Sequence, residues 1–196
     1  MNLGRIVEVF PRANCAWLIE IAYQAPPSGI DTPNEMASFA SQFGHETAGF
    51  TRFEENLNYS ADRLMAVWPS RFPDLASTAP YARNPEALAA KVYGTRMGNT
   101  EPGDGWRYRG RGPQVTGRHN YGKAGALVGL DLLAEPDMLL RPDVGVRVAC
   151  AGWKAFGLDL HDDDADARAE RRIVNGGVIG LRETQALLGK LLEVLS

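Results

Sequence analysis

The stretch that decides the fold is "TPNEMASFASQFGHE", residues 32–46, which has the pattern of an amphipathic helix with its start signal. Thr32 suits the N-cap, Pro33 suits the first helical position, and Glu35 completes a capping box. Apolar side chains then follow at i, i+3, i+4 and i+7: Met36, Phe39, Ala40 and Phe43. The stretch therefore predicts a helix with one buried face.

Three further helices are expected, after Asn84–Pro85, after Pro142–Asp143 and over residues 183–195. Residues 97–122 hold seven glycines and are predicted as a loop or irregular hairpin, although their aromatic residues argue against disorder. No strand–helix alternation suggests a parallel sheet. The expected fold class is therefore mainly α, with a small β-like insert that makes it formally α+β.

Length and composition indicate one globular domain over residues 1–196. The chain has 44% hydrophobic residues, 23% charged residues and a net charge of −3. That charge gives no general attraction to nucleic acid or to an anionic membrane, so a polyanionic target must be recognised by a local site. The sequence contains no run of 18 apolar residues, so no membrane span is predicted.

The start of the chain has an early Arg and Glu and no clean apolar region before a cleavage site. These residues are therefore predicted to be part of the mature fold and not a signal peptide. The cysteines are Cys15 and Cys150, without a CxxC motif. Two lone cysteines indicate reduced thiols in core positions and synthesis in the cytoplasm, although sequence leaves open whether they meet.

Glu46 is the residue that suggests chemistry. It lies three residues after Phe43 and seven after Phe39, so on a continuing helix it shares their buried face. Burial disfavours the anion and should raise the pKa of this carboxyl group, as a general acid requires. The alternative is a structural Glu, paired with an arginine or turned to solvent at the frayed helix end.

A second acidic pair, Glu54 and Glu55, follows in a turn-like segment. Two carboxyl groups allow a glycosidase to protonate the leaving group and to activate water, or to attack the sugar directly. The alternative is a solvated acidic pair beside Arg52.

Metal and phosphate sites are not indicated. "HETAG", residues 45–49, lacks a second His four residues after the first, so the zinc-protease helix is absent. The acidic run 162–166 resembles the start of an EF-hand calcium loop. Ala167 stands at the required Gly position and Ile173 at the closing Glu position, so the pattern fails at two positions. The glycine-rich segment has no GK[ST] motif.

Arg107, Arg109 and Arg111 alternate in "RYRGRG" beside Trp106. This pattern allows a minor hypothesis of single-stranded nucleic-acid binding through charge and stacking. If the segment is extended, the three arginines share a face opposite Tyr108, where they could grip an anionic substrate or neutralise buried acids.

Three segments, in the same order along the chain, resemble the signatures of glycoside hydrolase family 19, especially its bacterial and phage members. These are "FASQFGHETAGFTRFEENLNYSADRL", "YGTRMGNTEPGDGWRYRGRGPQVTGRHNYG" and "RRIVNGGVIGLRE". The resemblance implies a lysozyme-like fold with two helical lobes around a substrate cleft. It also implies inverting hydrolysis of β-1,4 links between N-acetylated hexosamines, without metal or cofactor.

By motif position, the resemblance assigns Glu46 as the general acid, Glu55 as the base and Thr116 as the residue that holds the attacking water. Substrate-binding roles are implied for five further positions: His45, Gln114, Asn120, Tyr121 and Asn175. "GRGPQVTG" is one residue shorter than the phage pattern, which in an extended segment would turn Gln114 and Thr116 to the opposite face.

The expected function is an endolysin-type glycosidase that cuts peptidoglycan glycan strands and causes lysis. Such a protein would be a monomer without a separate wall-binding domain, made in the host cytoplasm and released to the periplasm and cell wall by a separate holin. The alternatives are a chitinase and, in a different class, an inactive wall-binding protein. No nucleic-acid partner and no stable membrane insertion are expected.

Overall fold

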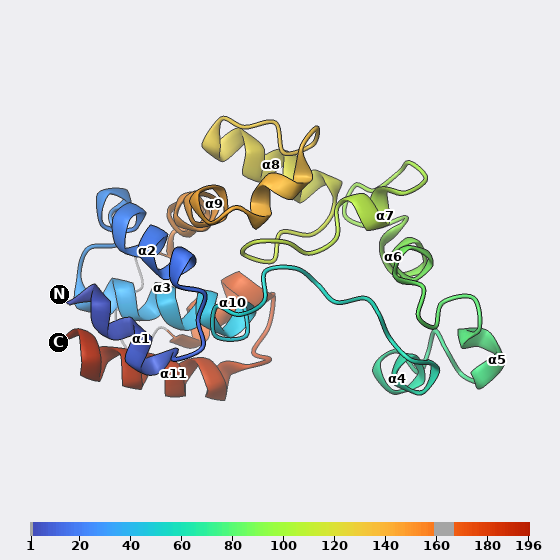
Figure 1. Cartoon of the computed structure of the whole chain (residues 1–196), viewed down its shortest axis with the longest axis horizontal. Helices are drawn as coiled ribbons and strands as arrows, with labels where there is room; N and C mark the ends of the chain where they lie inside the picture. Colours follow the sequence, from blue (N-terminus) through green and yellow to red (C-terminus); the bar gives the residue numbers. More distant parts are fainter. Residues whose placement is uncertain (1, 159–166) are drawn as a thin grey trace.

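The computed structural model describes residues 2–158 and 167–196, so the acidic run with Asp162, Asp164 and Asp166 lies outside the described residues. Within the described part, the chain forms helices and no strand, which confirms the mainly helical class (Figure 1). The helices are η1 (Leu3–Arg5), α1 (Ile6–Val9), α2 (Cys15–Gln24), η2 (Pro26–Ser28), α3 (Pro33–Glu46), α4 (Ala61–Val67), α5 (Leu75–Thr78), α6 (Pro85–Tyr93), α7 (Asp104–Arg107), α8 (Arg118–Val128), η3 (Pro136–Leu140), α9 (Pro142–Ala155), α10 (Ala167–Asn175) and α11 (Leu181–Leu195). The described helices include none that is long and apolar enough for a membrane span.

Helix α3 begins as its sequence predicts. The Thr32 hydroxyl accepts from the Glu35 backbone N–H at 3.2 Å, and the Glu35 carboxylate accepts from the Thr32 backbone N–H at 3.0 Å. Pro33 stands at the first helical position, where a missing N–H costs nothing. This reciprocal capping fixes the start of the helix that ends at Glu46.

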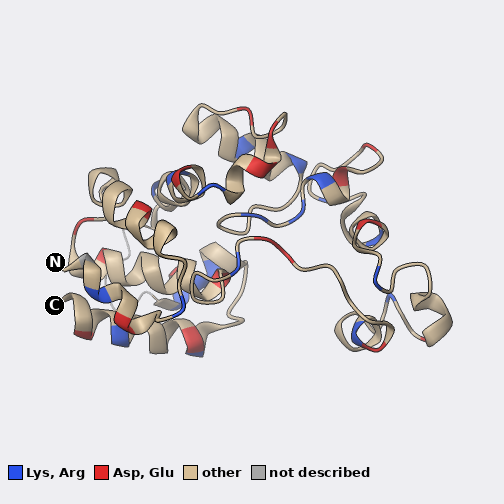
Figure 2. Ribbon diagram, viewed as in Figure 1, with Lys and Arg blue, Asp and Glu red and all other residues tan. Residues whose placement is uncertain are grey.

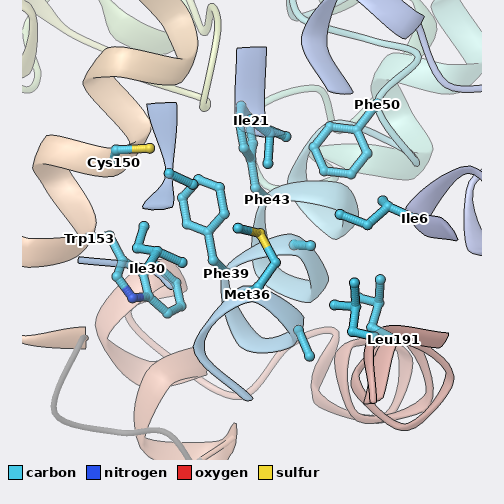
Figure 3. Close-up of a cluster of buried hydrophobic side chains, with 14 of the residues drawn as sticks. Ile6, Ile21, Ile30, Met36, Phe39, Phe43, Phe50, Cys150, Trp153 and Leu191 are labelled. Carbon is cyan, nitrogen blue, oxygen red and sulfur yellow. The ribbon is translucent and has the colours of Figure 1, made fainter. Parts of the chain in front are cut away.

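The largest core surrounds α3 (Figure 3). Met36 and Phe39 of α3 are buried beside Ile21 of α2, and Trp153 of α9 meets Phe39 edge to face, with ring centroids 5.4 Å apart. Leu191 of α11 is buried in the same cluster. Helices from distant parts of the sequence thus enclose α3.

Two smaller cores lie outside this one. Leu64 of α4 and Leu88 of α6 belong to a cluster of their own, and Tyr121 of α8 packs with Val144 of α9 in another. Helices α4, α5 and α6 stand apart from the group of α1, α2, α3 and α11, and the extended segment after α3 runs between them (Figure 1). The arrangement agrees with the two helical lobes that the resemblance implies.

Residues 97–122 are more ordered than a loop. The Asp104 carboxylate accepts from the backbone N–H groups of Thr100 and Glu101, both at 3.1 Å, and this turn leads into α7. Helix α8 begins at Arg118, still inside the glycine-rich stretch. The β-like insert is reduced to two isolated bridges, which pair Arg111 with Glu54 and with Val115.

The two thiols differ, and the expectation that both lie in the core is wrong for Cys15. Cys15 is the first residue of α2 and is exposed, whereas Cys150 is buried, and both are free. Burial raises the pKa of the Cys150 thiol to about 12.

Because Cys15 is exposed and Cys150 is buried, we expect a maleimide to label one thiol per native molecule and two after denaturation, as counted by mass spectrometry. Rapid labelling of Cys150 in the native protein would contradict this packing.

Candidate functional site

A cavity of about 320 Å³ lies between α3, α8, α9, α10 and the turn that precedes α8. Its lining contains four residues that the sequence marked for function: Glu46, Gln114, Thr116 and Asn120. Most of the remaining lining is apolar, including Phe43, Leu127 and Phe156. The cavity therefore combines a few polar groups with apolar walls, as small-ligand sites commonly do.

Glu46 is held by an ion pair at the cavity. It is the last residue of α3, and its side chain is 24% exposed. Arg171 of α10, whose side chain is 3% exposed, donates from Nη1 to Oε1 of Glu46 at 2.6 Å. The arginine partner that the sequence left open as the alternative is therefore present, and Glu46 also lines the cavity.

A polar network extends behind this pair. Arg171 also donates to Gln42 Oε1 at 3.3 Å and to the backbone carbonyl of Ile179 at 2.7 Å. Gln42 in turn donates to Glu170 at 3.4 Å, and the hydroxyl of Ser38 donates to the same carboxylate. The network fixes the position of Arg171, and so of the carboxylate that it holds.

Sequence reasoning did not identify these supporting residues, although a signal was present. Ser38, Gln42 and Glu46 lie at i, i+4 and i+8 on α3, which puts three polar side chains on one line of a helix that is buried from Met36 to Gly44. A polar stripe of this kind indicates an internal partner, since buried polar groups are almost always hydrogen-bonded.

Glu55 adjoins the cavity through Gly110. The Glu55 backbone N–H donates to the Gly110 carbonyl at 2.9 Å. A Cβ atom on Gly110 would lie 3.0 Å from Gln114 Oε1, 3.2 Å from Thr116 Oγ1 and 3.4 Å from Glu55 Cβ. These three side chains thus converge on one glycine, and two of them, Gln114 and Thr116, also line the cavity that contains Glu46.

The hydroxyl of Tyr93 donates to Oε1 of Glu55 at 2.6 Å. Burial, and next the hydrogen bond to Glu55, raise the pKa of Tyr93 above its usual range, so the hydroxyl remains a donor at every pH suited to an assay. Tyr93 is therefore placed to orient the Glu55 carboxylate.

We expect Tyr93→Phe to lower kcat about tenfold because a hydrogen bond to a charged group is worth about 1.5–3 kcal/mol, of which only part bears on turnover. Initial rates of the glycosidase reaction that the resemblance implies measure the effect. Tyr59→Phe is the matched control, since the Tyr59 hydroxyl bonds to none of the described residues. Equal rates for Tyr93→Phe and wild type would remove Tyr93 from this role.

Glu54 has a different environment from its neighbour. It pairs with Arg109 and with Nε of Arg111, the latter at 3.3 Å, and buried Arg111 also pairs with Asp137 at 2.7 Å. Arg107 donates to two backbone carbonyl groups. Of the two possibilities for the alternating arginines, neutralisation of acids is the one that the structure supports, because Arg109 and Arg111 are already paired.

The turn between Arg111 and Val115 explains how the shorter motif fits. The two residues exchange backbone hydrogen bonds of 3.1 and 3.0 Å, and Gln114 has a φ of +63°. A non-glycine residue rarely adopts this left-handed conformation, which is commonest at functional sites and turns. Because the segment is a tight turn and not extended, Gln114 and Thr116 both line the cavity.

Three other predicted site residues lie elsewhere. Tyr121 is fully buried, and its hydroxyl donates to the Arg109 carbonyl at 2.7 Å. It therefore stabilises the neighbouring backbone and is not exposed for contact with a sugar. Burial raises the pKa of Tyr121 to about 12. The ring of His45 lies against Gly180, and Asn175 is exposed; neither lines the cavity. Sugar binding by His45 and Asn175 stays a prediction.

Comparison with known proteins identifies the family of the chain. Residues 28–159 match the family described as "Chitinase class I". A "Glycosyl hydrolase family 19 domain-containing protein" from Haemophilus influenzae is 37% identical over 179 residues, which are 90% of this chain and 88% of that protein. An "Endochitinase 1" from Theobroma cacao is 35% identical over 120 residues, which are 61% of this chain and 32% of that protein. The chain thus spans less than half of this plant relative.

Solved structures of low sequence identity share the fold. Chitinase C from Streptomyces griseus superposes with a TM-score of 0.61 at 17% identity, covering 99% of this chain and 91% of that chain. A mutant of chitinase C gives a TM-score of 0.65 at 16% identity, with 99% and 76% coverage. The match over residues 28–159 and the bacterial relative covered almost throughout show that this chain is an enzyme of glycoside hydrolase family 19.

Proposed function

We propose that the enzyme hydrolyses the β-1,4 links of peptidoglycan glycan strands by inversion, with Glu46 as general acid, Glu55 as general base and Thr116 as the residue that holds the attacking water. The observation that carries this proposal is the position of Thr116. Its side chain lines the cavity with Glu46, and its hydroxyl shares the crowded space at Gly110 with Glu55.

Each group has one task in this mechanism. Protonated Glu46 gives its proton to the glycosidic oxygen as the bond to the anomeric carbon breaks. Glu55 takes a proton from a water molecule that attacks the anomeric carbon from the opposite face, which inverts its configuration. This route needs the two carboxyl groups about 6.5–9.5 Å apart, with room for the water. Arg171 then stabilises the carboxylate that remains on Glu46.

Two observations support peptidoglycan as the substrate. The family relative matched over 88% of its length comes from a bacterium. The free thiols of Cys15 and Cys150 suit synthesis in a reducing compartment, as in an endolysin made inside the host and released through a holin lesion. Chitin is the second candidate, favoured by the names of the plant relatives and of the solved chitinases.

Purified enzyme incubated with peptidoglycan and, separately, with chitin oligomers tests the proposal. New reducing ends should form from peptidoglycan, and NMR should show the α-anomer first. Labelling those ends distinguishes cleavage after N-acetylmuramic acid from cleavage after N-acetylglucosamine. Cleavage of chitin alone would make the protein a chitinase, and binding without cleavage of either polymer would favour the inactive wall-binding class.

A further inference from the structure

Lys123 is a cation at the cavity without an internal partner. It lies on α8, is exposed and lines the cavity. Among the described lining residues, the charged side chains are Glu46 and Lys123, and Glu46 is paired with Arg171. Lys123 forms no ion pair or hydrogen bond with any residue that the structure describes. Its ammonium group is therefore available to a ligand.

Four arginines near the site are already engaged. Arg109 and Arg111 pair with Glu54, Arg107 binds backbone carbonyls and Arg171 holds Glu46. Elsewhere, acidic and basic residues are interspersed along the ribbon, and the net charge is −3 (Figure 2). A negatively charged target gains little from the general surface, so recognition must come from a local group such as Lys123.

Apolar side chains in the cavity lining accompany Lys123. Leu127 lies one helical turn further along α8 and is 48% exposed, and Phe156, at the end of α9, is 66% exposed. Large apolar residues left in solvent at a cavity are typical of ligand contact. A cation beside apolar walls suits a ligand that carries a carboxylate next to small apolar groups.

This combination distinguishes the two candidate polymers. Chitin is a uniform chain of N-acetylglucosamine and carries no charge. Peptidoglycan carries, on alternate sugars, a lactyl-linked peptide with carboxylates and alanine methyl groups. On the basis of the proposed function, we infer that Lys123, with Leu127 and Phe156, forms a subsite for the acidic peptide stem and so favours stem-bearing glycan over neutral glycan.

Binding to uncleaved strands tests the subsite separately from catalysis. The dissociation constant of the Glu46→Gln variant is measured for soluble stem-bearing strands and for the same strands after an amidase has removed the stems. We expect the stems to tighten binding about five- to tenfold, as one partly desolvated charge-assisted contact allows, with a smaller gain at high salt.

Adding Lys123→Met to that variant should abolish the gain from the stems and leave binding of stripped strands unchanged, whereas Lys123→Arg should keep the gain. Lys190→Met on α11 is the matched control, because Lys190 is exposed and does not line the cavity. Equal weakening of both strand types by Lys123→Met, or no weakening at all, would overturn the inference. Failure of the wild-type enzyme to cleave any strand would instead count against the proposed function.

Discussion

Glu46→Gln is expected to lower the rate of glycan cleavage about 10²–10⁴-fold, the usual contribution of a positioned general acid. An amide has no proton to give to the leaving oxygen at any working pH. Its carbonyl oxygen can still accept from Arg171 Nη1, which lies 2.6 Å from Oε1 of the native carboxylate. Initial rates from reducing-end assays, together with thermal unfolding, should show a folded and inactive protein.

Glu46→Ala separates the chemical role from the structural one. This change removes the acceptor as well as the acid, and leaves Arg171, whose side chain is 3% exposed, without its carboxylate partner. We expect the same loss of activity with an added loss of about 1–3 kcal/mol in the free energy of unfolding.

Turbidity of permeabilised Gram-negative cells provides a second readout for Glu46→Gln. Equal lysis by wild type and Glu46→Gln would show that another group supplies the proton.

Glu55→Gln is expected to give the second large effect, a fall of about 10²–10⁴-fold in kcat, because the amide cannot take a proton from the attacking water. Tyr93, which donates to Oε1 at 2.6 Å, can donate equally to the amide oxygen, so the side chain should keep its place. The same reducing-end assay and a thermal melt measure this variant.

Glu54→Gln is the control at the adjacent position. Glu54 neutralises Arg109 and Arg111, so its loss should reduce stability while most of the activity remains. If Glu54→Gln is folded but inactive while Glu55→Gln stays active, the general base is Glu54 and not Glu55.

The parts of the fold that sequence predicts are those set by neighbours along the chain. The capping box of Thr32 and Glu35 and the start of α6 at Pro85 each depend on a few adjacent residues, and both were predicted correctly. Glycine content misled over residues 97–122, because Asp104 closes a turn and starts α7 with hydrogen bonds that composition does not indicate.

The site was less predictable because its decisive contacts join distant positions. The partner of Glu46, Arg171, comes from α10, far along the chain, so periodicity could suggest a buried acid and offer an arginine only as an alternative. Periodicity also could not choose between Glu54 and Glu55. The structure shows their difference: one pairs with arginines, while the other lies against Gly110 and Tyr93.

The packing of α11 against α3 has a consequence for the timing of biosynthesis. Helix α3 ends at Glu46, whereas α11 begins at Leu181, and both contribute to one core. At about 5–20 residues per second, a ribosome needs on the order of ten seconds to pass from one to the other. During that interval α3, which carries Glu46, lacks the packing of α11 against it. We therefore expect a ribosome-bound nascent chain to become hydrolytic only after α11 has emerged.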